Sequence, residues 1–416
     1  MIRTQHISLK SGAAHRAGRL HLRSRGASLI ELMVAMTIGL IVALIVVATV
    51  TGVGASFRTI GSNASAQVSA QVGLGLIDEA GRSAGAGFYS NGQIICPSIN
   101  AWASGVTRLN DATLMPVRIT DGGAATASDT ITFTTSAGVG PLSNMPVMVN
   151  MATAGEDITV NDSGLIAAND LAVVGAPGGG GPCTLFQVTS APVPSVVCGG
   201  NATSCKVLPR ATDPATGYNP PDPAAAFAVP SAYGFSTAGG ALGPATVVRI
   251  GAAFRQPAFT VQCEALVAYN AFTDAPTCTT NPLSFAGGGN ALASDIVLMH
   301  AQYGISPDAV TDEVTAWVDA AGVDWAAPTA DNVQRIKAIR VILISRAKEA
   351  ATTDVTTAAC TNDAGVVNVG PCSFQDAAAP VIDLSATPVA AGRTWQNYRY
   401  RVHRAIIPLR NVLWSN

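Results

Sequence analysis

The sequence predicts an α+β protein. In this prediction a long N-terminal α-helix, apolar in its first half, packs on a mostly antiparallel β-sheet that belongs to an enlarged, disulfide-bonded, β-rich body. Three observations lead to it: an uninterrupted apolar run precedes a helical pattern, short strand-like runs fill most of the remaining chain, and all eight cysteines follow the apolar run. With 416 residues and only 12% charged side chains, the chain can bury a large core and is not of the charge-rich disordered class.

The apolar run covers residues 27–50, contains no proline and has Glu31 as its only ionisable side chain. As a helix it would be about 36 Å long, enough to cross the roughly 30 Å hydrocarbon core of a bilayer. Residues 1–26 carry six of the 24 Lys and Arg and no acid, so the rest of the chain is acidic overall. The positive-inside rule then predicts a cytoplasmic N-terminus and an external body. An acidic body also argues against nucleic-acid binding.

The residues around this run distinguish it from a plain signal anchor or a cleavable secretory signal, whose apolar stretch is shorter. The segment RSRGASLIELMVA (23–35) resembles the class III leader of type IV prepilins. The resemblance implies a basic leader over residues 1–26, which a prepilin peptidase removes between Gly26 and Ala27, and N-terminal methylation of the new terminus. This chain departs from the usual pattern by having Ala27 in place of Phe and by its long leader.

Glu31 would be the fifth residue of the mature chain. An unpaired carboxylate inside a membrane costs roughly 2.5 kcal/mol or more, so it needs a counter-charge. The resemblance to pilins implies that Glu31 meets the α-amine of Ala27 in a neighbouring subunit and so sets the register of assembly. The alternative is that Glu31 reaches the lipid headgroups or complements the positive helix N-terminus.

Residues 52–81 are predicted to extend the transmembrane or filament-core helix of residues 27–51 as an amphipathic helix, because apolar residues recur at steps of three and four. Each glycine in this segment costs roughly 1 kcal/mol relative to alanine, so a kink or a partly melted turn is expected. The expected apolar face consists of Val53, Phe57, Ile60, Ala64, Val68 and Val72.

The body, residues 82–416, has strand-like periodicity in short runs bounded by Gly, Pro, Asn and Asp. Residues 178–181 and 214–230 are predicted to be loops. Residues 331–348 are predicted to form a short helix or turn, with an Asp as its possible cap, leading into a central strand, and residues 398–411 a half-buried strand. The other expected strands are 129–135, 157–160, 171–175, 183–189, 246–254, 259–269 and 294–303.

A second resemblance covers both ends of the body. IDEAGRSAGAGFY (77–89), VLMHAQYGI (297–305) with Trp317, RIKAIRVILISR (335–346) and YRYRVHRAIIPLRN (398–411) are similar, in order, to blocks of minor pilins of the PilW family. The resemblance implies a type IV pilin fold with a family-like C-terminal sheet over residues 294–416 and a variable insertion over about 96–282. The residues that match the family blocks, expected to have structural roles, are Arg82, Tyr303, Arg346, Arg410 and Asn411.

The eight cysteines lie on the side of the membrane where disulfides form, and their even number predicts four bonds. Cys263 with Cys278 and Cys360 with Cys372 enclose short hairpin-like loops and are the favoured pairs. Metal binding by thiolates is not expected, because there is no CxxC motif and only two histidines follow the leader. Among the four remaining cysteines, Cys96, Cys183, Cys198 and Cys205, the pairing of 183 with 198 is slightly favoured.

No catalytic signature is found. GAPGGGGPC (175–183) has no Lys-Ser/Thr and no helical pattern after it, so it is not a phosphate-binding loop. The chain has no G-x-S-x-G and no H-E-x-x-H, and a calcium loop around Asn362, Asp363 and Asn368 lacks the spacing of an EF-hand. Neither an enzymatic activity nor a cofactor is predicted.

The resemblances together imply a minor pilin that begins as a single-pass inner-membrane protein and then enters an extracellular type IV pilus. They imply a role in priming assembly at or near the tip, and in twitching motility, adhesion or DNA uptake. The implied partners are other minor pilins, the major pilin, the prepilin peptidase and the inner-membrane assembly platform, with a tip adhesin as a further candidate. The alternatives are a type II secretion pseudopilin of the J kind, an adhesive module at residues 96–282 carried on a pilin stalk, and a membrane-anchored enzyme.

Overall fold

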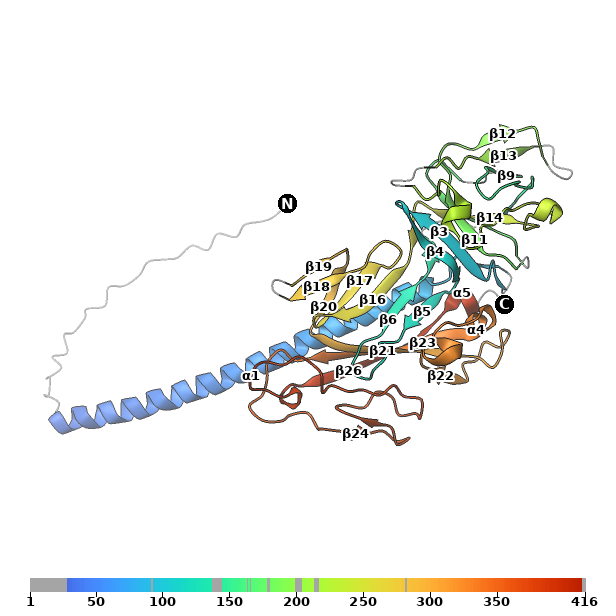
Figure 1. Ribbon diagram of the computed structural model, residues 1–416. Helices are drawn as coiled ribbons and strands as arrows, with labels where there is room; N and C mark the ends of the chain where they lie inside the picture. The colour runs from blue at the N-terminus through green and yellow to red at the C-terminus, as the bar shows by residue number, and fades with distance from the viewer. Residues whose placement is uncertain are drawn as a thin grey trace, which may run out of the picture. The chain divides into compact units, whose positions relative to one another are not determined.

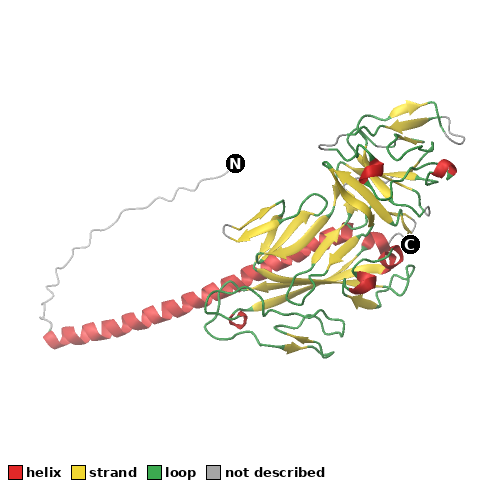
Figure 2. Ribbon diagram, in the orientation of Figure 1, coloured by secondary structure: helices red, strands yellow, loops and turns green. Residues whose placement is uncertain are grey.

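The computed structural model describes residues 28–90, 93–136, 144–162, 164, 166–177, 180–198, 204–212, 217–280 and 283–413 (Figures 1 and 2). The long helix α1 (Leu29–Ser83) runs without interruption through all of its glycines, so the expected melted turn is not found. The chain divides into two compact units, Met1–Arg58 and Thr59–Asn416, which are described separately. Figure 2 shows that strands and loops make up most of the second unit, which is the body.

Within the body, the last turns of α1 pack through small residues. The buried positions Ala66, Ala70, Gly73, Ile77 and Ala80 follow steps of three and four. The expected face was therefore wrong in its described part, because its members remain exposed. These exposed residues are Ile60 (63%), Ala64, Val68 (59%) and Val72 (51%).

Small residues are needed because the helix approaches two sheets closely. A Cβ atom at Gly73 would lie 2.6 Å from Leu266 Cδ2, and one at Gly81 would lie 2.5 Å from Ile407 Cγ2. Leu266 belongs to a five-stranded sheet in the order β20-β17-β16-β6-β5, and Ile407 belongs to a four-stranded sheet in the order β22-β21-β23-β26. The five-stranded sheet consists of β20 (Asn290–Ser294), β17 (Ala265–Asn270), β16 (Pro257–Gln262), β6 (Thr130–Phe133) and β5 (Val117–Thr120).

The central strands of the four-stranded sheet are buried on both faces. Its strand β23 (Ile336–Arg346) has no exposed residue. Ile339, Val341 and Leu343 join the core around α1, whereas Ile342 and Ile344 join a second cluster on the other face. That face is covered by residues 347–399, which we call the strap and which contain Ile382 and Leu384 of the same cluster. The other strands of the sheet are β22 (Ala316–Val318), β21 (Ile296–Ile305) and β26 (Tyr400–Pro408).

A six-stranded sheet, in the order β4-β3-β11-β10-β14-β8, forms the rest of the body with a three-stranded sheet, β12-β13-β9. Residues of β10 alternate between two cores, Val173 facing one and Val174 the other. Of the named strand pairs only β3 with β11 is parallel, so the mostly antiparallel α+β prediction is confirmed. The strands are β3 (Ser98–Ala103), β4 (Val106–Thr113), β8 (Asn144–Pro146), β9 (Ile158–Val160), β10 (Leu171–Gly175), β11 (Cys183–Gln187), β12 (Val193–Ser195), β13 (Cys205–Leu208) and β14 (Thr246–Gly251).

Short elements complete the described chain. α4 is capped by Thr329, whose side chain accepts a hydrogen bond from the Asn332 amide, rather than by the expected Asp. The short strands are β1 (Tyr89–Ser90), β2 (Gln93–Ile94), β7 (Thr135–Ser136), β15 (Phe254–Arg255), β18 (Thr277–Thr280), β19 (Leu283–Ala286), β24 (Cys360–Thr361) and β25 (Val367–Asn368). The short helices are α2 (Pro223–Ala226), α3 (Gly322–Trp325), α4 (Ala330–Arg335) and α5 (Arg410–Leu413), with 3-10 turns at Ala238–Gly240 and Trp395–Asn397.

The single strand expected over residues 259–269 is wrong. The structure places a two-residue turn between β16 and β17, in which Cys263 (φ 47°) and Glu264 (φ 59°) both have left-handed backbone conformations. Such hairpin turns usually contain Asn-Gly, so the sequence carries no local signal for this one. The disulfide to Cys278 and an ion pair from Glu264 to Arg346 hold the turn from outside.

The disulfides are Cys96–Cys183, Cys198–Cys205, Cys263–Cys278 and Cys360–Cys372. The two favoured hairpin-loop pairs are thus found, but the pairing of Cys183 with Cys198 was wrong. The parallel pairing of β11 with β3 sets Cys183 opposite Ile99 and so brings it to Cys96. Cys198 instead bonds Cys205 across the β12–β13 hairpin.

The segment at residues 96–282 is not structurally separate from the family-like region. Its strands β5, β6, β16 and β17 contribute Val117, Phe133, Phe259 and Leu266 to the core that contains Ile77 of α1. Within this segment, the six- and three-stranded sheets contribute to two further cores that contain no described residue of α1. The variability of this segment stays a prediction.

Candidate assembly site

The N-terminal part of α1 combines an apolar surface with a single acid. All residues from Ser28 to Val50 are exposed, and Leu29–Val50 is long and apolar enough to cross a membrane. Glu31 stands in the first turn, where a negative charge complements the helix N-terminus. Within the described residues its carboxylate has no hydrogen bond or ion pair, so it is available to a cation from outside. Gly26 and Ala27, the predicted processing site, lie outside the described residues.

The C-terminal end of α1 is held by the end of the chain. Asn411 Nδ2 donates hydrogen bonds to the carbonyl oxygens of Arg82 (3.3 Å) and Ala84 (2.9 Å). These bonds satisfy carbonyls that a helix end leaves without partners. Arg82 pairs with Asp78 at 2.7 Å on the same helix, and Arg410 is the first residue of α5 beside Asn411. The contacts of Arg82 and Asn411 are thus structural.

Tyr303 joins the two sheets that face α1. Its fully buried hydroxyl accepts a hydrogen bond from the Ile119 amide of β5 at 2.6 Å. Burial raises the pKa of Tyr303 to about 12, so the hydroxyl stays protonated at neutral pH. This contact joins β21 to β5, and the expected structural role of Tyr303 stays a prediction.

Arg346, at the end of β23, joins the β16–β17 turn to the strap. Its guanidinium donates to Glu264 Oε2 at 2.5 Å and to the carbonyl oxygen of Pro388. It also lies 4.7 Å from the ring centroid of Tyr398, within the range of cation–π attraction. The contacts with Pro388 and Tyr398 hold the strap at this end of the sheet, and the contact with Glu264 holds the β16–β17 turn.

A second strap-holding residue, Arg340, was not among the residues singled out from the sequence. It lies in the middle of β23 with a side chain 2% exposed. Its guanidinium makes two bonds to Asp376 (2.6 and 3.0 Å), one to Gln302 Oε1 (2.6 Å) and one to the Ala378 carbonyl (2.8 Å). The hydrogen bonds and charge of Arg340 lower the pKa of Asp376. An arginine in the middle of a mainly apolar strand was the available signal for this role.

A polar cavity of about 230 Å³ lies at His300 and Asp129. His300 Nδ1 is 3.4 Å from Asp129 Oδ2, and its Nε2 is 3.2 Å from the Ala125 carbonyl oxygen. Burial alone would lower the pKa of His300, but the hydrogen bond and charge of Asp129, with smaller contributions from Ala125 and Asp121, raise it. Asp129 is also held by the backbone amide of Ala301 at 2.8 Å. The pair therefore has structural partners on both sides.

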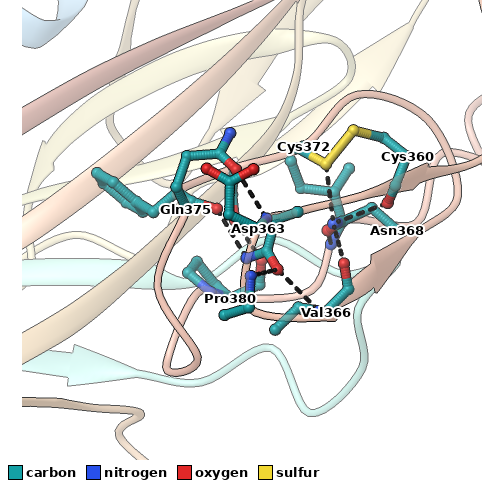
Figure 3. The surroundings of a disulfide bond; sticks show 12 residues. Cys360, Asp363, Val366, Asn368, Cys372, Gln375 and Pro380 are labelled. Carbon is teal, nitrogen blue, oxygen red and sulfur yellow. Dashed lines mark hydrogen bonds between the residues drawn. A yellow bond between two sulfur atoms is a disulfide. The ribbon is translucent and has the colours of Figure 1, made fainter.

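The strap loop closed by Cys360–Cys372 does not present free oxygen ligands at its asparagines (Figure 3). Asn362 Oδ1 accepts from the Val366 amide (2.8 Å) and the Ala364 amide (3.1 Å), and Asn368 Oδ1 accepts from the Ile382 amide (2.7 Å). These amide bonds argue against the calcium alternative. Across the described ranges, no group of three or more His, Cys, Asp or Glu could hold a metal ion.

Two family models match the chain. The model described as PilW, type IV pilus-assembly protein W, matches residues 278–411, and the prokaryotic N-terminal methylation motif matches residues 22–47. No curated protein and no solved structure matches. The first match contains Tyr303, Arg346, Arg410 and Asn411, and the second contains the Gly26–Ala27 junction and Glu31. Domains of this family are structural and non-enzymatic, and the methylation motif with the apolar helix fits a membrane-anchored pilin. Over residues 22–47 and 278–411, the chain is therefore similar to a PilW-family pilin.

Proposed function

We propose that this protein is a minor pilin which is processed after Gly26, primes assembly of a type IV pilus and is incorporated at or near its tip. The observation that carries the proposal is the position of Glu31, a lone acid without a partner in the described chain, in the first turn of an exposed apolar helix. Processing would create a new α-amine at Ala27, and Glu31 of the next subunit would neutralise it in the filament core. An ion pair inside an apolar core holds its register because a slip would leave both charges buried and unpaired.

A second observation supports burial of α1 by other subunits. Three apolar side chains of α1 are separated by eight and four residues along the helix and are more than half exposed in the isolated chain: Ile60, Val68 and Val72. Residues spaced by four lie along one side of a helix, so a neighbouring helix could cover all three. Moving Leu29–Val50 from lipid to other apolar helices would exchange one apolar environment for another, which allows extrusion and retraction.

The proposed location before assembly is the inner membrane, with a cytoplasmic leader and a periplasmic body. The partners would then be the prepilin peptidase, the assembly platform, the major pilin and other minor pilins, with a tip adhesin as a further candidate. The match to PilW over residues 278–411 favours a pilus over a type II secretion pseudopilus.

The direct test compares Glu31→Gln with Glu79→Gln, which removes an exposed acid from the same helix. We expect Glu31→Gln to abolish recovery of the protein in sheared pili and Glu79→Gln to leave it unchanged. N-terminal sequencing with and without the peptidase should give Ala27 only when the enzyme is present. A mature terminus elsewhere, or normal incorporation of the Glu31→Gln protein, would contradict the proposal.

A further inference from the structure

Strand β26 forms one edge of the four-stranded sheet, beyond β23 in the order β22-β21-β23-β26 (Figure 1). It is nine residues long, and its pairing with β23 extends from Tyr400 opposite Arg346 to Pro408 opposite Ala338 without a register shift. A long regular strand paired on one side presents a row of backbone donors and acceptors on the other.

The backbone groups that point away from β23 can be identified from two bonds at the ends of this ladder. The Ala347 amide donates to the Arg399 carbonyl at 2.8 Å, and the Leu409 amide donates to the Lys337 carbonyl at 2.9 Å. Facing and outward residues alternate along an antiparallel strand, so the N–H and C=O groups of Val402, Arg404 and Ile406 point outward. Across the described chain no hydrogen bond reaches these outward groups.

The opposite edge of the same sheet is closed by the body itself. Strand β22 pairs with the last residues of β21, from Tyr303 to Ile305. Further along β21, the Asp129 amide donates to the Met299 carbonyl at 2.9 Å, and Asp129 Oδ2 accepts from the Ala301 amide at 2.8 Å. The fold thus covers one edge and leaves the β26 edge open.

The open edge carries positive charge. Arg399, Arg401 and Arg404 are exposed, and none forms an ion pair with a carboxylate in the part of the chain that the structure describes. The Arg404 guanidinium already donates to the carbonyl oxygens of Ser373 and Cys372 in the strap, whereas Arg399 and Arg401 remain available. Burial and the charge of Arg401 lower the pKa of His403, so this ring adds no charge at neutral pH. The sequence contains no Asp or Glu after Asp383. Charges of one sign on an edge deter pairing with a copy of the same strand and favour a partner of opposite charge.

We propose that β26 accepts an extended acidic segment of a partner protein as an additional strand of the sheet. Val402, Arg404 and Ile406 would supply the backbone hydrogen bonds, and the side chains of Arg399 and Arg401 would select carboxylates. Alternating outward N–H and C=O groups match a polypeptide backbone, whereas a nucleic acid would use only the arginines. The β26 edge does not involve Glu31. This proposal can therefore fail while the proposed function holds, and the proposed function can fail while this proposal holds.

The test uses the full chain in detergent micelles and a fluorescent peptide of alternating Val and Glu with the length of β26. A peptide of alternating Val and Lys and a DNA oligonucleotide are the matched probes. We expect saturable binding of the Val/Glu peptide alone, measured by fluorescence anisotropy. Hydrogen–deuterium exchange should show at least tenfold slower exchange at the amides of Val402, Arg404 and Ile406 when the peptide is bound.

Two variants separate the contributions of backbone and charge. Ile406→Pro removes an outward donor without removing a bond to β23, and its side chain is already 60% exposed. The control Ile406→Ala keeps the donor. Arg399→Glu with Arg401→Glu reverses the charge, and Arg108→Glu is the control at an exposed arginine on another sheet. We expect Ile406→Pro and the double reversal each to weaken binding by about tenfold or more, and both controls to change it less than about threefold.

Equal binding of the Val/Lys peptide, preferred binding of DNA, or unchanged binding by Ile406→Pro and by the charge reversal would each overturn the proposal. Slower exchange at the three amides that depends on protein concentration without peptide would identify a second copy as the occupant and would also overturn it. If Ile406→Pro fails to fold, the charge reversal and the exchange pattern decide the result.

Discussion

Replacing Arg340 by Met tests whether one buried guanidinium holds the strap on the four-stranded sheet. The substitution keeps a long apolar side chain between Trp317 and Phe374, whose ring centroids lie 4.9 and 4.4 Å from the guanidinium carbon. It removes four hydrogen bonds, two of them to Asp376. The loss therefore reports on polar contacts rather than on a cavity.

The expected cost follows from the surroundings of each partner. Gln302 is 1% exposed, so its oxygen would be left buried without a donor, at a cost of about 1–3 kcal/mol. The side chain of Asp376 is 46% exposed, so water can replace part of its lost bonds and the ion pair itself contributes only about 1 kcal/mol. Together these give about 3 kcal/mol, or roughly a hundredfold increase in the fraction of chains with an open strap.

The assay is hydrogen–deuterium exchange at strap amides, with Ile382 as the reporter because its amide bonds Asn368. The controls are Asp376→Asn and the double variant, which together isolate the pair's coupling. Because Arg340 lowers the pKa of Asp376, their bond stabilises the fold above the usual carboxyl pKa and is lost as pH falls through the folded-state value. Only wild type should therefore show this loss at low pH. Exchange at Ile382 less than about threefold faster in Arg340→Met would refute the reasoning.

Three further predictions use the same structure. Gly81→Ala should destabilise the body by about 1–3 kcal/mol, because the added methyl carbon would meet a side chain of β26. Gly75→Ala is the control: no atom lies within 4 Å of the added carbon, so it should stabilise the helix by about 1 kcal/mol. Thermal unfolding measures both changes. Because the pKa of His300 is raised in the folded protein, protonated His300 stabilises the fold fully below the usual histidine pKa, and this stability is lost as pH rises through the folded-state pKa. Hydrogen–deuterium exchange in the cavity loop should therefore accelerate over that pH range. In His300→Gln the exchange should no longer depend on pH in this way. Replacing Cys96 and Cys183, which are 87 residues apart, by Ser should lower stability by about 4–5 kcal/mol in denaturant titrations, and an unchanged midpoint would contradict the loop-entropy argument.

Features that depend on neighbouring residues in the sequence could be predicted. The Gly26 motif and the apolar helix are continuous in the chain, and the motif match at residues 22–47 confirms that prediction. The buried strand after residue 335 is long and mainly apolar, and it appears as β23. The pairs Cys263–Cys278 and Cys360–Cys372 close loops of 15 and 12 residues, so short chain separation favours them.

Features that depend on distant contacts could not be predicted. The partner of Cys183 follows from the parallel pairing of β11 with β3, which no local pattern indicates. The turn at Cys263 and Glu264 has neither Asn nor Gly, and it exists because a disulfide and Arg346 hold it. Arg340 finds its main partner in the strap, 36 residues away. In each case the determining contact joins segments that the sequence separates.

Which face of α1 is buried depends both on the local sequence pattern and on contacts with distant segments. Hydrophobic periodicity favours the larger side chains, and each Val or Ile that is fully buried would gain roughly 1.5–3 kcal/mol. The body nevertheless buries Ala70 and Gly73, since α1 lies against two sheets and larger side chains would force it away from Leu266. Val68 and Val72 are thus left exposed. The free energy of burying these two valines is therefore not gained in the isolated chain and is available for assembly. We expect other subunits to cover this face of the helix, which is the face that the hydrophobic periodicity indicates.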